Sequence, residues 1–294
     1  MLVPNSLDEA VAGLAAHPDA TLLAGGTDLM VEINEGHRRF AWPDGDTDVI
    51  ALTRVPELST WTFDPHARTV TLGAAVTWSE IEREPLRGML PALAEAARTV
   101  GSPQIRNAGT VGGNLATCSP AGDGLPVFAA LDAQVNLVGA VGRRTMPVGD
   151  FMVGVKRTAL APGEMIESLT LPLLDGWQGY SKVGVRNAMV IATASACVAV
   201  DVPSRSVRLA LGSVAPTIIR CPDAEAYAGS AVDWDARTAG AGVASRFGEL
   251  AAETSRPIDD HRSTAAYRRH AVGVMAARLL TRAFPARAFP GGHQ

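Results

Sequence analysis

Two glycine-rich segments constrain this sequence more than any other feature. The first, LLAGGTDL at residues 22–29, is an apolar run that ends in a glycine pair and continues into Thr27 and Asp28, residue types typical of a helix start. The second, SPQIRNAGTVGGNLATCSPAGDGLPV at residues 102–127, contains five glycines. Glycine costs about 0.5–1 kcal/mol wherever alanine would serve, so this density indicates sharp turns or a close approach to the backbone.

Two interpretations of these segments are open. Tight turns alone would explain a single glycine pair. Alternatively, both loops offer backbone N–H groups to a phosphate, as glycine-rich loops before helices do. The segments contain no GxGxxG or GxxxxGK[ST] sequence and no lysine beside either pair, which excludes a Rossmann turn and a Walker A loop. A pyrophosphate held mostly by N–H groups fits better than a transferable phosphate, and the two loops are predicted to form two walls of one dinucleotide slot.

Hydrophobic periodicity predicts an α+β protein. Residues 6–9 form a capping box before a helix, and short apolar strands at 20–25 and 48–52 complete a small β/α layer. A strand at 69–76, a second capping box at 77–80 and a helix at 90–100 begin a second lobe. The remaining elements expected in this lobe are a hairpin at 133–139 and 143–149 and a strand at 165–172.

A third part is expected after the turn-rich segment 172–179. Three antiparallel strands are predicted at 180–185, 194–202 and 206–214, followed by helices. The last helix is expected to be capped by Ser263, with an apolar face and with its arginines, Arg268, Arg269, Arg278 and Arg282, in solvent. The predicted parts are residues 1–54, 55–175 and 178–284, with a flexible tail at 285–294.

Composition narrows the possible partners. The chain of 294 residues has a net charge of -4, with 26 Lys+Arg against 30 Asp+Glu, and lacks a basic run, so we expect no nucleic-acid partner. It has no stretch of 18 uninterrupted apolar residues and no signal peptide pattern at its start, so we expect a cytoplasmic protein without membrane insertion. The three cysteines are scattered and the six histidines show no HxxxH or HExxH spacing, so no metal ligands are predicted on this chain.

Four segments together resemble the flavin-carrying medium subunit of molybdenum hydroxylases, the group that contains xanthine dehydrogenase and carbon monoxide dehydrogenase. They are LLAGGTDL, IRNAGTVGGNL with its trailing SPAGD, MPVGDFMVGVKRTALAPGEMIESLTLP and TAAYRRHAVGVMAARLL. The likeness runs from about Asn5 to Phe284. It implies an FAD-binding domain of the vanillyl-alcohol-oxidase (PCMH) type in two lobes, followed by a C-terminal domain with a three-stranded antiparallel sheet and helices.

The resemblance also implies which residues bind FAD. The pyrophosphate would meet the backbone of the first loop and of residues 109–113, with side-chain bonds from Thr110 and Asn114. On its own, Asp123 is equally well explained as an Asx turn, and Lys182 as a solvated lysine. The residues implied are Leu22, Leu23, Ala24, Gly25, Gly26, Thr27, Asp28, Leu29, Val100, Gly109, Thr110, Val111, Gly112, Gly113, Asn114, Asp123, Ile166 and Lys182.

In this family a large subunit oxidises the substrate at molybdenum and a small subunit passes electrons through [2Fe–2S] clusters to the FAD. The resemblance therefore implies an oxidoreductase subunit with non-covalent FAD and no catalytic acid or base, in a dimer of heterotrimers. The substrate expected at molybdenum is a purine such as xanthine. Many relatives carry Asp where Val190 stands, and the vertebrate-like enzymes carry Tyr at the position of Val155, which leaves the acceptor open between NAD and another molecule.

Two other functions are compatible with the residues. The chain could be a stand-alone FAD-dependent oxidoreductase of the same fold that acts on a small substrate or on NAD(P)H. It could also be a flavin-free interaction subunit in which the glycines only make turns. If FAD binds, Gly25→Val or Gly112→Val is expected to block it by steric contact at the pyrophosphate.

Overall fold

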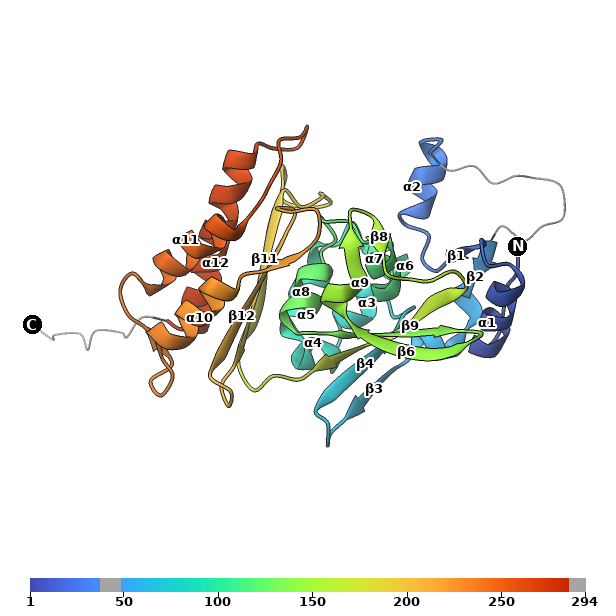
Figure 1. Cartoon of the computed structure of the whole chain (residues 1–294), viewed down its shortest axis with the longest axis horizontal. Coiled ribbons are helices and arrows are strands. Elements are labelled where there is room, and N and C mark those ends of the chain that lie inside the picture. Colours follow the sequence, from blue (N-terminus) through green and yellow to red (C-terminus); the bar gives the residue numbers. More distant parts are fainter. Residues whose placement is uncertain (38–48, 286–294) are drawn as a thin grey trace, which may run out of the picture.

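The structure is a computed structural model that describes residues 1–37 and 49–285. Helix α1 (Leu7–Ala16) is capped by Ser6, whose hydroxyl accepts the N–H of Glu9 as the capping box predicts. Strand β1 (Thr21–Leu23) pairs in parallel with β2 (Val49–Ala51), and α2 (Leu29–Asn34) follows β1. In Figure 1 this first part lies at the end of the molecule opposite the C-terminal helices.

The second part is built on a five-stranded antiparallel sheet. Its strand order is β3-β4-β9-β5-β6, so the long strand β9 lies at the centre. The predicted hairpin is confirmed as β5 with β6, and β9 pairs with both β4 and β5. The strands are β3 (Trp61–Asp64), β4 (Thr69–Gly73), β5 (Gln134–Gly139), β6 (Gly142–Pro147) and β9 (Glu164–Pro172).

Helices of the second part pack beside this sheet and carry the second glycine-rich segment. The hydroxyl of Thr77 accepts the N–H of Glu80 at the start of α3, which confirms the second capping box. The helices are α3 (Trp78–Ile81), α4 (Leu86–Met89), α5 (Pro91–Thr99), α6 (Pro103–Ala108), α7 (Val111–Thr117), α8 (Leu125–Ala130) and α9 (Val148–Phe151). Shorter elements are η1 (Leu52–Arg54), η2 (Pro56–Ser59), β7 (Met152–Gly154) and β8 (Arg157–Thr158).

The third part is an antiparallel sheet covered by helices. The three predicted strands are present as β10 (Gln178–Val183), β11 (Ala194–Asp201) and β12 (Ser206–Gly212), and a two-residue strand β13 (Ile219–Arg220) adds a fourth. Its other elements are α10 (Pro222–Ala231), β14 (Val232–Asp233), β15 (Thr238–Ala239), α11 (Val243–Thr254) and α12 (Ala265–Ala283). The pairing of β13 with β12 involves only two residues of each strand, which is too short to give a sequence signal.

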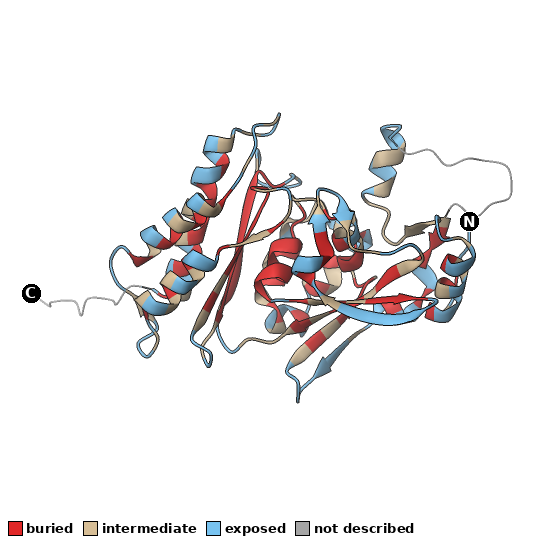
Figure 2. Cartoon of the chain, in the orientation of Figure 1, coloured by how far each residue is buried: buried red, intermediate tan, exposed pale blue. Residues whose placement is uncertain are grey.

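The sheet of the third part is buried on both faces. Helix α12 contacts β11 from one side, while α5 and α8 of the second part contact β10, β11 and β12 from the other (Figure 1). Residues 194–200 of β11 are all buried, and the middle of the sheet is red in Figure 2. Tyr180 and Cys197 belong to the same buried cluster as the core of the second part. One face of the C-terminal sheet is therefore part of the hydrophobic core of the second part, the predicted second lobe of the FAD-binding domain.

The last helix differs from its predicted pattern in two respects. Its N-cap is Thr264, whose hydroxyl accepts the N–H of Tyr267, and Ser263 lies one residue before it. Arg268 is buried, because its guanidinium donates to the carbonyls of Thr193 and Ser213 and to Asp260. The charge pattern of a helix predicts that its arginines lie in solvent, and it does not reveal an arginine that is buried because it bonds to distant carbonyls.

The division of the chain at residue 54 and at 172–179 stays a prediction. Of the flexible tail predicted at 285–294, residues 286–294 lie outside the described residues, as does residue 48 of the second predicted strand.

Candidate functional site

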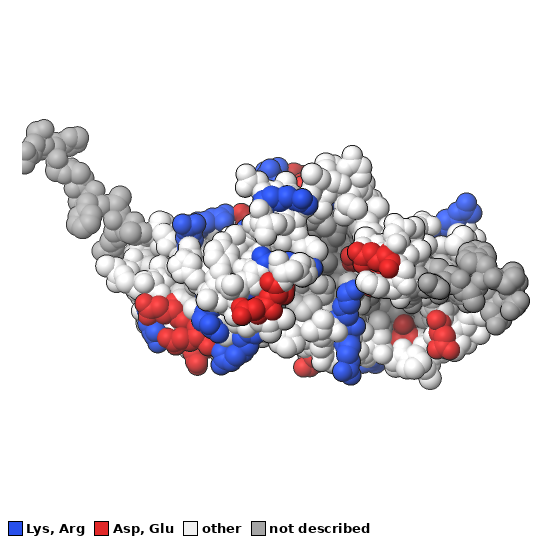
Figure 3. All heavy atoms as spheres, turned by 90° about the horizontal axis from the view of Figure 1, so that it is seen from above, with Lys and Arg blue, Asp and Glu red and all other residues white. Residues whose placement is uncertain are grey.

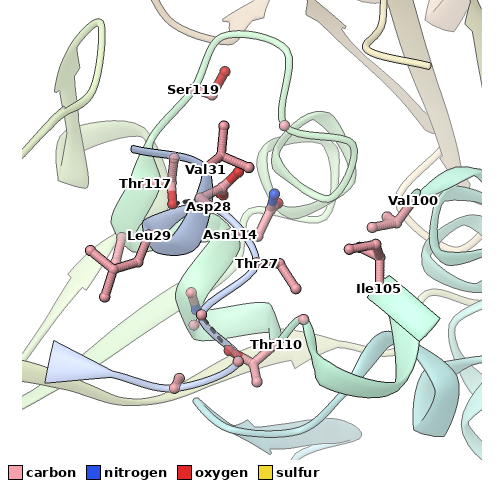
Figure 4. Close-up of a pocket in the computed structure, with 18 of the residues that line it drawn as sticks. Thr27, Asp28, Leu29, Val31, Val100, Ile105, Thr110, Asn114, Thr117 and Ser119 are labelled. Atoms are coloured by element: carbon pink, nitrogen blue, oxygen red, sulfur yellow. Dashed lines mark hydrogen bonds between the residues drawn. The ribbon is translucent and has the colours of Figure 1, made fainter. Parts of the chain in front are cut away.

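The two glycine-rich segments face each other across one cavity of about 860 Å³. Figure 4 shows Asp28, Leu29 and Val31 on one side of it, helix α7 with Asn114 beside them, and Val100 with Ile105 on the opposite side. Of the residues predicted from sequence, all but Val111 and Lys182 line this cavity. Those that do are Leu22, Leu23, Ala24, Gly25, Gly26, Thr27, Asp28, Leu29, Val100, Gly109, Thr110, Gly112, Gly113, Asn114, Asp123 and Ile166.

The first loop presents a row of free backbone donors. The N–H groups of residues 25–29 donate to no acceptor within the described part of the chain. Gly26 has a φ of +69°, a left-handed conformation that glycine adopts without strain, and it turns the chain between β1 and α2. Successive unpaired N–H groups around such a turn form a concave site that attracts anions. This loop therefore offers unpaired donors of the kind that a phosphate needs, and its binding of the pyrophosphate stays a prediction.

The second loop uses its backbone donors internally. The N–H of Val111 donates to Val76 at 3.0 Å, and that of Gly112 donates to Ala74 at 2.9 Å. The N–H of Gly113 donates to the hydroxyl of Thr110 at 3.0 Å, which caps α7. The N–H of Gly109 also donates within the protein, to Ile105 at 2.6 Å, so four of the five N–H groups expected to face a phosphate here are already paired. Contact of this loop with the pyrophosphate stays a prediction. The Val111 side chain is fully buried in the core instead of facing the cavity.

The glycines allow protein segments to approach one another. A Cβ atom at Gly25 would lie 1.9 Å from the carbonyl oxygen of Ala108, and one at Gly112 would lie 2.6 Å from the carbonyl oxygen of Ala74. The close approach predicted from sequence is thus present, but at these two positions the neighbour is backbone of another segment. A side chain at Gly25 or Gly112 would therefore clash with the protein backbone before it could contact a pyrophosphate.

Polar side chains fix the cavity walls. The hydroxyl of Thr117 on α7 donates to Asp28 at 3.0 Å, and Lys156 forms an ion pair with Glu32 on α2 at 3.0 Å. Both contacts fasten α2, none of whose residues is buried, to the body of the molecule. The Oδ1 atom of Asn114 is buried and has no hydrogen-bond partner among the described residues. An amide at the cavity wall with an unused acceptor is suited to a ligand that carries N–H or O–H groups.

Asp123 is a buried carboxylate at the cavity wall, with 8% of its surface exposed. It accepts the hydroxyl of Tyr180 at 2.9 Å and the ammonium group of Lys182 at 2.7 Å. Burial raises the pKa of Asp123, while Lys182 and Tyr180 act in the opposite direction. Lys182 is buried behind Asp123, so it neither lines the cavity nor lies in solvent, the two alternatives that the sequence suggested.

Several lining residues escaped the sequence analysis. Trp78, which is 2% exposed, packs against both Gly109 and Gly124, and its only sequence signal is its place after the Thr77 cap. Lys156 lies in one of the four segments that carry the resemblance but was not singled out there, and Met189 and Ile191 come from the loop between β10 and β11. Val190 does line the cavity, whereas Val155 is 55% exposed and does not.

No metal centre and no membrane span is found in the described chain. Across residues 1–37 and 49–285, no group of three or more His, Cys, Asp or Glu side chains is arranged to hold a metal ion. In the same ranges no helix has the length and apolar character needed to cross a membrane. On the face drawn in Figure 3, positive and negative side chains are interspersed without a continuous basic field.

The fold and the cavity define a dinucleotide-binding protein of the α+β class. The cavity volume lies in the upper part of the range of about 300–1,000 Å³ that ligand pockets span. Unpaired N–H groups suit a pyrophosphate, the apolar side chains of Val100, Ile105 and Ile166 suit a ring system, and Asn114 and Asp123 suit hydroxyl or N–H donors. The residues present therefore fit a flavin dinucleotide.

The chain belongs to the family of FAD-binding subunits of molybdopterin dehydrogenases. Residues 1–174 match the FAD-binding domain in molybdopterin dehydrogenase, and residues 180–283 match the CO dehydrogenase flavoprotein C-terminal domain. These matches confirm the resemblance found in the sequence, together with the fold class, the FAD cofactor and the oxidoreductase assignment that it implies.

Individual relatives agree with this family. The chain is 33% identical to the carbon monoxide dehydrogenase medium chain of Hydrogenophaga pseudoflava over 96% of this chain and 95% of that protein. It is 36% identical to the nicotinate dehydrogenase FAD-subunit of Eubacterium barkeri over 69% of each chain. A solved structure of the Hydrogenophaga pseudoflava carbon monoxide dehydrogenase, lacking the Mo-pyranopterin moiety of its cofactor, superimposes with a TM-score of 0.83, 31% identity and 96% coverage of both chains.

Proposed function

We propose that this FAD subunit of the molybdenum hydroxylase family accepts electrons from the [2Fe–2S] clusters of a small partner subunit. A large partner subunit carries the molybdenum cofactor, and the three chains assemble as a dimer of heterotrimers in the cytoplasm. The observation that carries the proposal is the cavity, one wall of which offers the free N–H groups of residues 25–29. Relatives that match over most of this chain are described as medium chains, which supports the partner subunits.

Within this assembly the chain's own residues bind and orient the cofactor. FAD, when bound, supplies the redox chemistry, so the protein needs no acid or base of its own. The first loop would hold the pyrophosphate, while Val100, Ile105 and Ile166 would contact apolar parts of the cofactor and exclude water from them. Asn114 and Asp123 would accept hydrogen bonds from its N–H or O–H groups. The lining residues identified above constitute the proposed FAD site.

We further propose that the substrate oxidised at molybdenum is a purine such as xanthine and that the subunit passes its electrons to NAD or another acceptor. Support comes from the FAD-binding subunit XdhB of Escherichia coli, described as a putative xanthine dehydrogenase subunit, which is 27% identical over 96% of this chain. Other relatives bear the names of nicotinate, carbon monoxide and glyceraldehyde enzymes. These compounds therefore define the competing substrates for an assay.

The decisive experiment is an absorption spectrum of the chain purified alone, followed by release of the cofactor by heat. Near-stoichiometric flavin bands, with the freed compound identified as FAD, are expected. A colourless protein that also fails to take up added FAD would contradict the proposal. Co-purification with partner subunits, metal analysis for Mo and Fe, and turnover of xanthine, nicotinate or carbon monoxide with NAD or a dye as acceptor would then test the partners, substrate and acceptor separately.

A further inference from the structure

Asp123, which lines the cavity, is held from behind by two side chains of the C-terminal sheet. Tyr180 and Lys182 lie on the same face of strand β10, two residues apart, and both reach the carboxylate of Asp123 in the loop after α7. Tyr180 donates to Oδ1 at 2.9 Å and Lys182 donates to Oδ2 at 2.7 Å, so the two side chains hold different oxygens of the carboxylate. The side chain of Thr99 also acts on this carboxylate. The ammonium group of Lys182 also donates to the carbonyl of Thr99 at 3.0 Å.

This contact is buried and anchored from several sides. Tyr180 is 5% exposed, and the side chains of Lys182 and Asp123 are 6% and 9% exposed. The backbone N–H of Tyr180 donates to Glu95 on α5 at 2.7 Å, and Glu95 in turn pairs with Arg282 on α12 at 2.6 Å. The groups with a charge or a titratable proton around Asp123 are therefore Lys182, Tyr180, Glu95 and, beyond Glu95, Arg282.

We propose that Tyr180 is a positioning residue of the FAD site, which together with Lys182 holds the Asp123 carboxylate at the cavity wall as a hydrogen-bond acceptor for the cofactor. The inference rests on the proposed function. A carboxylate has about four acceptor positions, which is more than the side chains of Tyr180, Lys182 and Thr99 occupy, so one is left for a ligand. Tyr180 itself does not line the cavity, so it acts through Asp123.

The hydroxyl of Tyr180 matters because the carboxylate is buried. Burial raises the pKa of Asp123, and the bond from Tyr180 is one of the interactions that lower it again. Tyr180 remains a donor throughout, since burial and the adjacent Asp123 charge raise its pKa well above the ordinary value. Without this hydroxyl, the pKa of Asp123 rises further, and more of the carboxyl group is protonated as the pH falls. A protonated Asp123 is a poorer acceptor for a ligand.

The test measures the FAD dissociation constant between pH 6 and 9 for the full chain and its variants. Tyr180→Phe is expected to weaken FAD binding roughly tenfold at the acid end, as loss of a charged acceptor does, and to approach the wild-type value at the alkaline end. Asp123→Asn is expected to weaken binding without this pH dependence, because the amide does not titrate. Tyr267→Phe is the matched control: Tyr267 is 48% exposed on α12, and binding should be unchanged.

A double-mutant cycle separates positioning from a structural role. If Tyr180 acts through Asp123, Tyr180→Phe has no further effect on FAD binding in the Asp123→Asn background. An equal effect in both backgrounds, or a Tyr180→Phe dissociation constant equal to that of the wild type at every pH, would overturn the inference while leaving the FAD site intact. A wild-type chain that takes up no FAD overturns both the proposed function and the inference.

Discussion

Replacing Gly25 by alanine tests whether the loop glycines serve the ligand or the protein. The new Cβ atom would lie 1.9 Å from the carbonyl oxygen of Ala108 and 2.5 Å from its carbon, whereas real Cβ atoms essentially never approach closer than 3.0 Å. The two loops must therefore move apart by about 1 Å. Overpacking of this kind costs about 1–3 kcal/mol, and the upper end applies because the neighbour is backbone.

This destabilisation should be visible in the protein without FAD. For a folding unit of about 150–250 residues, 1 kcal/mol corresponds to roughly 2–4 °C in Tm, so Gly25→Ala should lower the Tm of the FAD-free chain by roughly 6–12 °C. Calorimetry or dichroism of FAD-free samples gives the value, and titration with FAD should reveal weakened binding, because the slot has changed shape.

Gly149→Ala is the matched control for this experiment. A Cβ atom at Gly149 has no atom within 4 Å, and its backbone lies in α9, so the Tm should be unchanged or slightly raised. If Gly25→Ala leaves the FAD-free Tm at the wild-type value and yet abolishes FAD binding, the reasoning is refuted. The glycine would then serve the pyrophosphate directly, as the sequence first suggested.

Three further predictions concern the same regions. Thr110→Val keeps the side-chain volume but removes the acceptor for the Gly113 N–H. The free energy of unfolding, measured with urea, should therefore fall by about 1 kcal/mol. Burial opposes ionisation of Asp260, but N–H donors of Arg262 and Ser263 and the guanidinium of Arg268 lower its pKa from 3.8 to about 2. The ionised Asp260 therefore stabilises the fold above pH 3.8, and this stabilisation is lost as the pH falls towards 2. Because 23% of the side chain is exposed and solvent screens the charge, the contribution to the free energy of unfolding is about 1 kcal/mol. In Asp260→Asn the free energy of unfolding should depend less on pH over this range. Stripping FAD from a sample that held it at 100–1,000 times Kd should remove roughly 3–4 kcal/mol of stability, measured as a fall in Tm that added FAD reverses; an equal Tm with and without FAD would contradict the site.

Local signals in the sequence were sufficient for the capped helices and for the longer strands, whereas short elements such as β3, α6 and α8 were not predicted. Both capping boxes begin helices, because the hydroxyls of Ser6 and Thr77 lie within reach of the N–H groups three residues on. The parallel pairing of β1 with β2 and the β5–β6 hairpin also follow from short apolar runs and turn residues. Such features depend on neighbours in the chain, and so they can be read from it.

Features that depend on distant partners could not be read in the same way. The burial of Arg268 requires the carbonyls of Thr193 and Ser213, and the burial of Lys182 requires Asp123. The sequence likewise identified the second glycine loop but not the use of its N–H groups, because Val111 and Gly112 donate to carbonyls in the segment that follows β4. Resemblance to a family located most of the cavity, but it did not distinguish donors to a ligand from donors to the protein.

The contact between Gly25 and Ala108 also limits how relatives can be recombined. A chimera that takes residues 1–54 from one subunit and the rest from another would combine the loop around Gly25 with a foreign loop around Ala108. The two loops fit together only if the backbone of each has the same conformation as in its own parent protein. Breakpoints between 172 and 180, where the two family matches meet, would leave that junction whole but divide Asp123 from Tyr180 and Lys182. A functional exchange of domains should therefore carry the three polar residues as one compatible set.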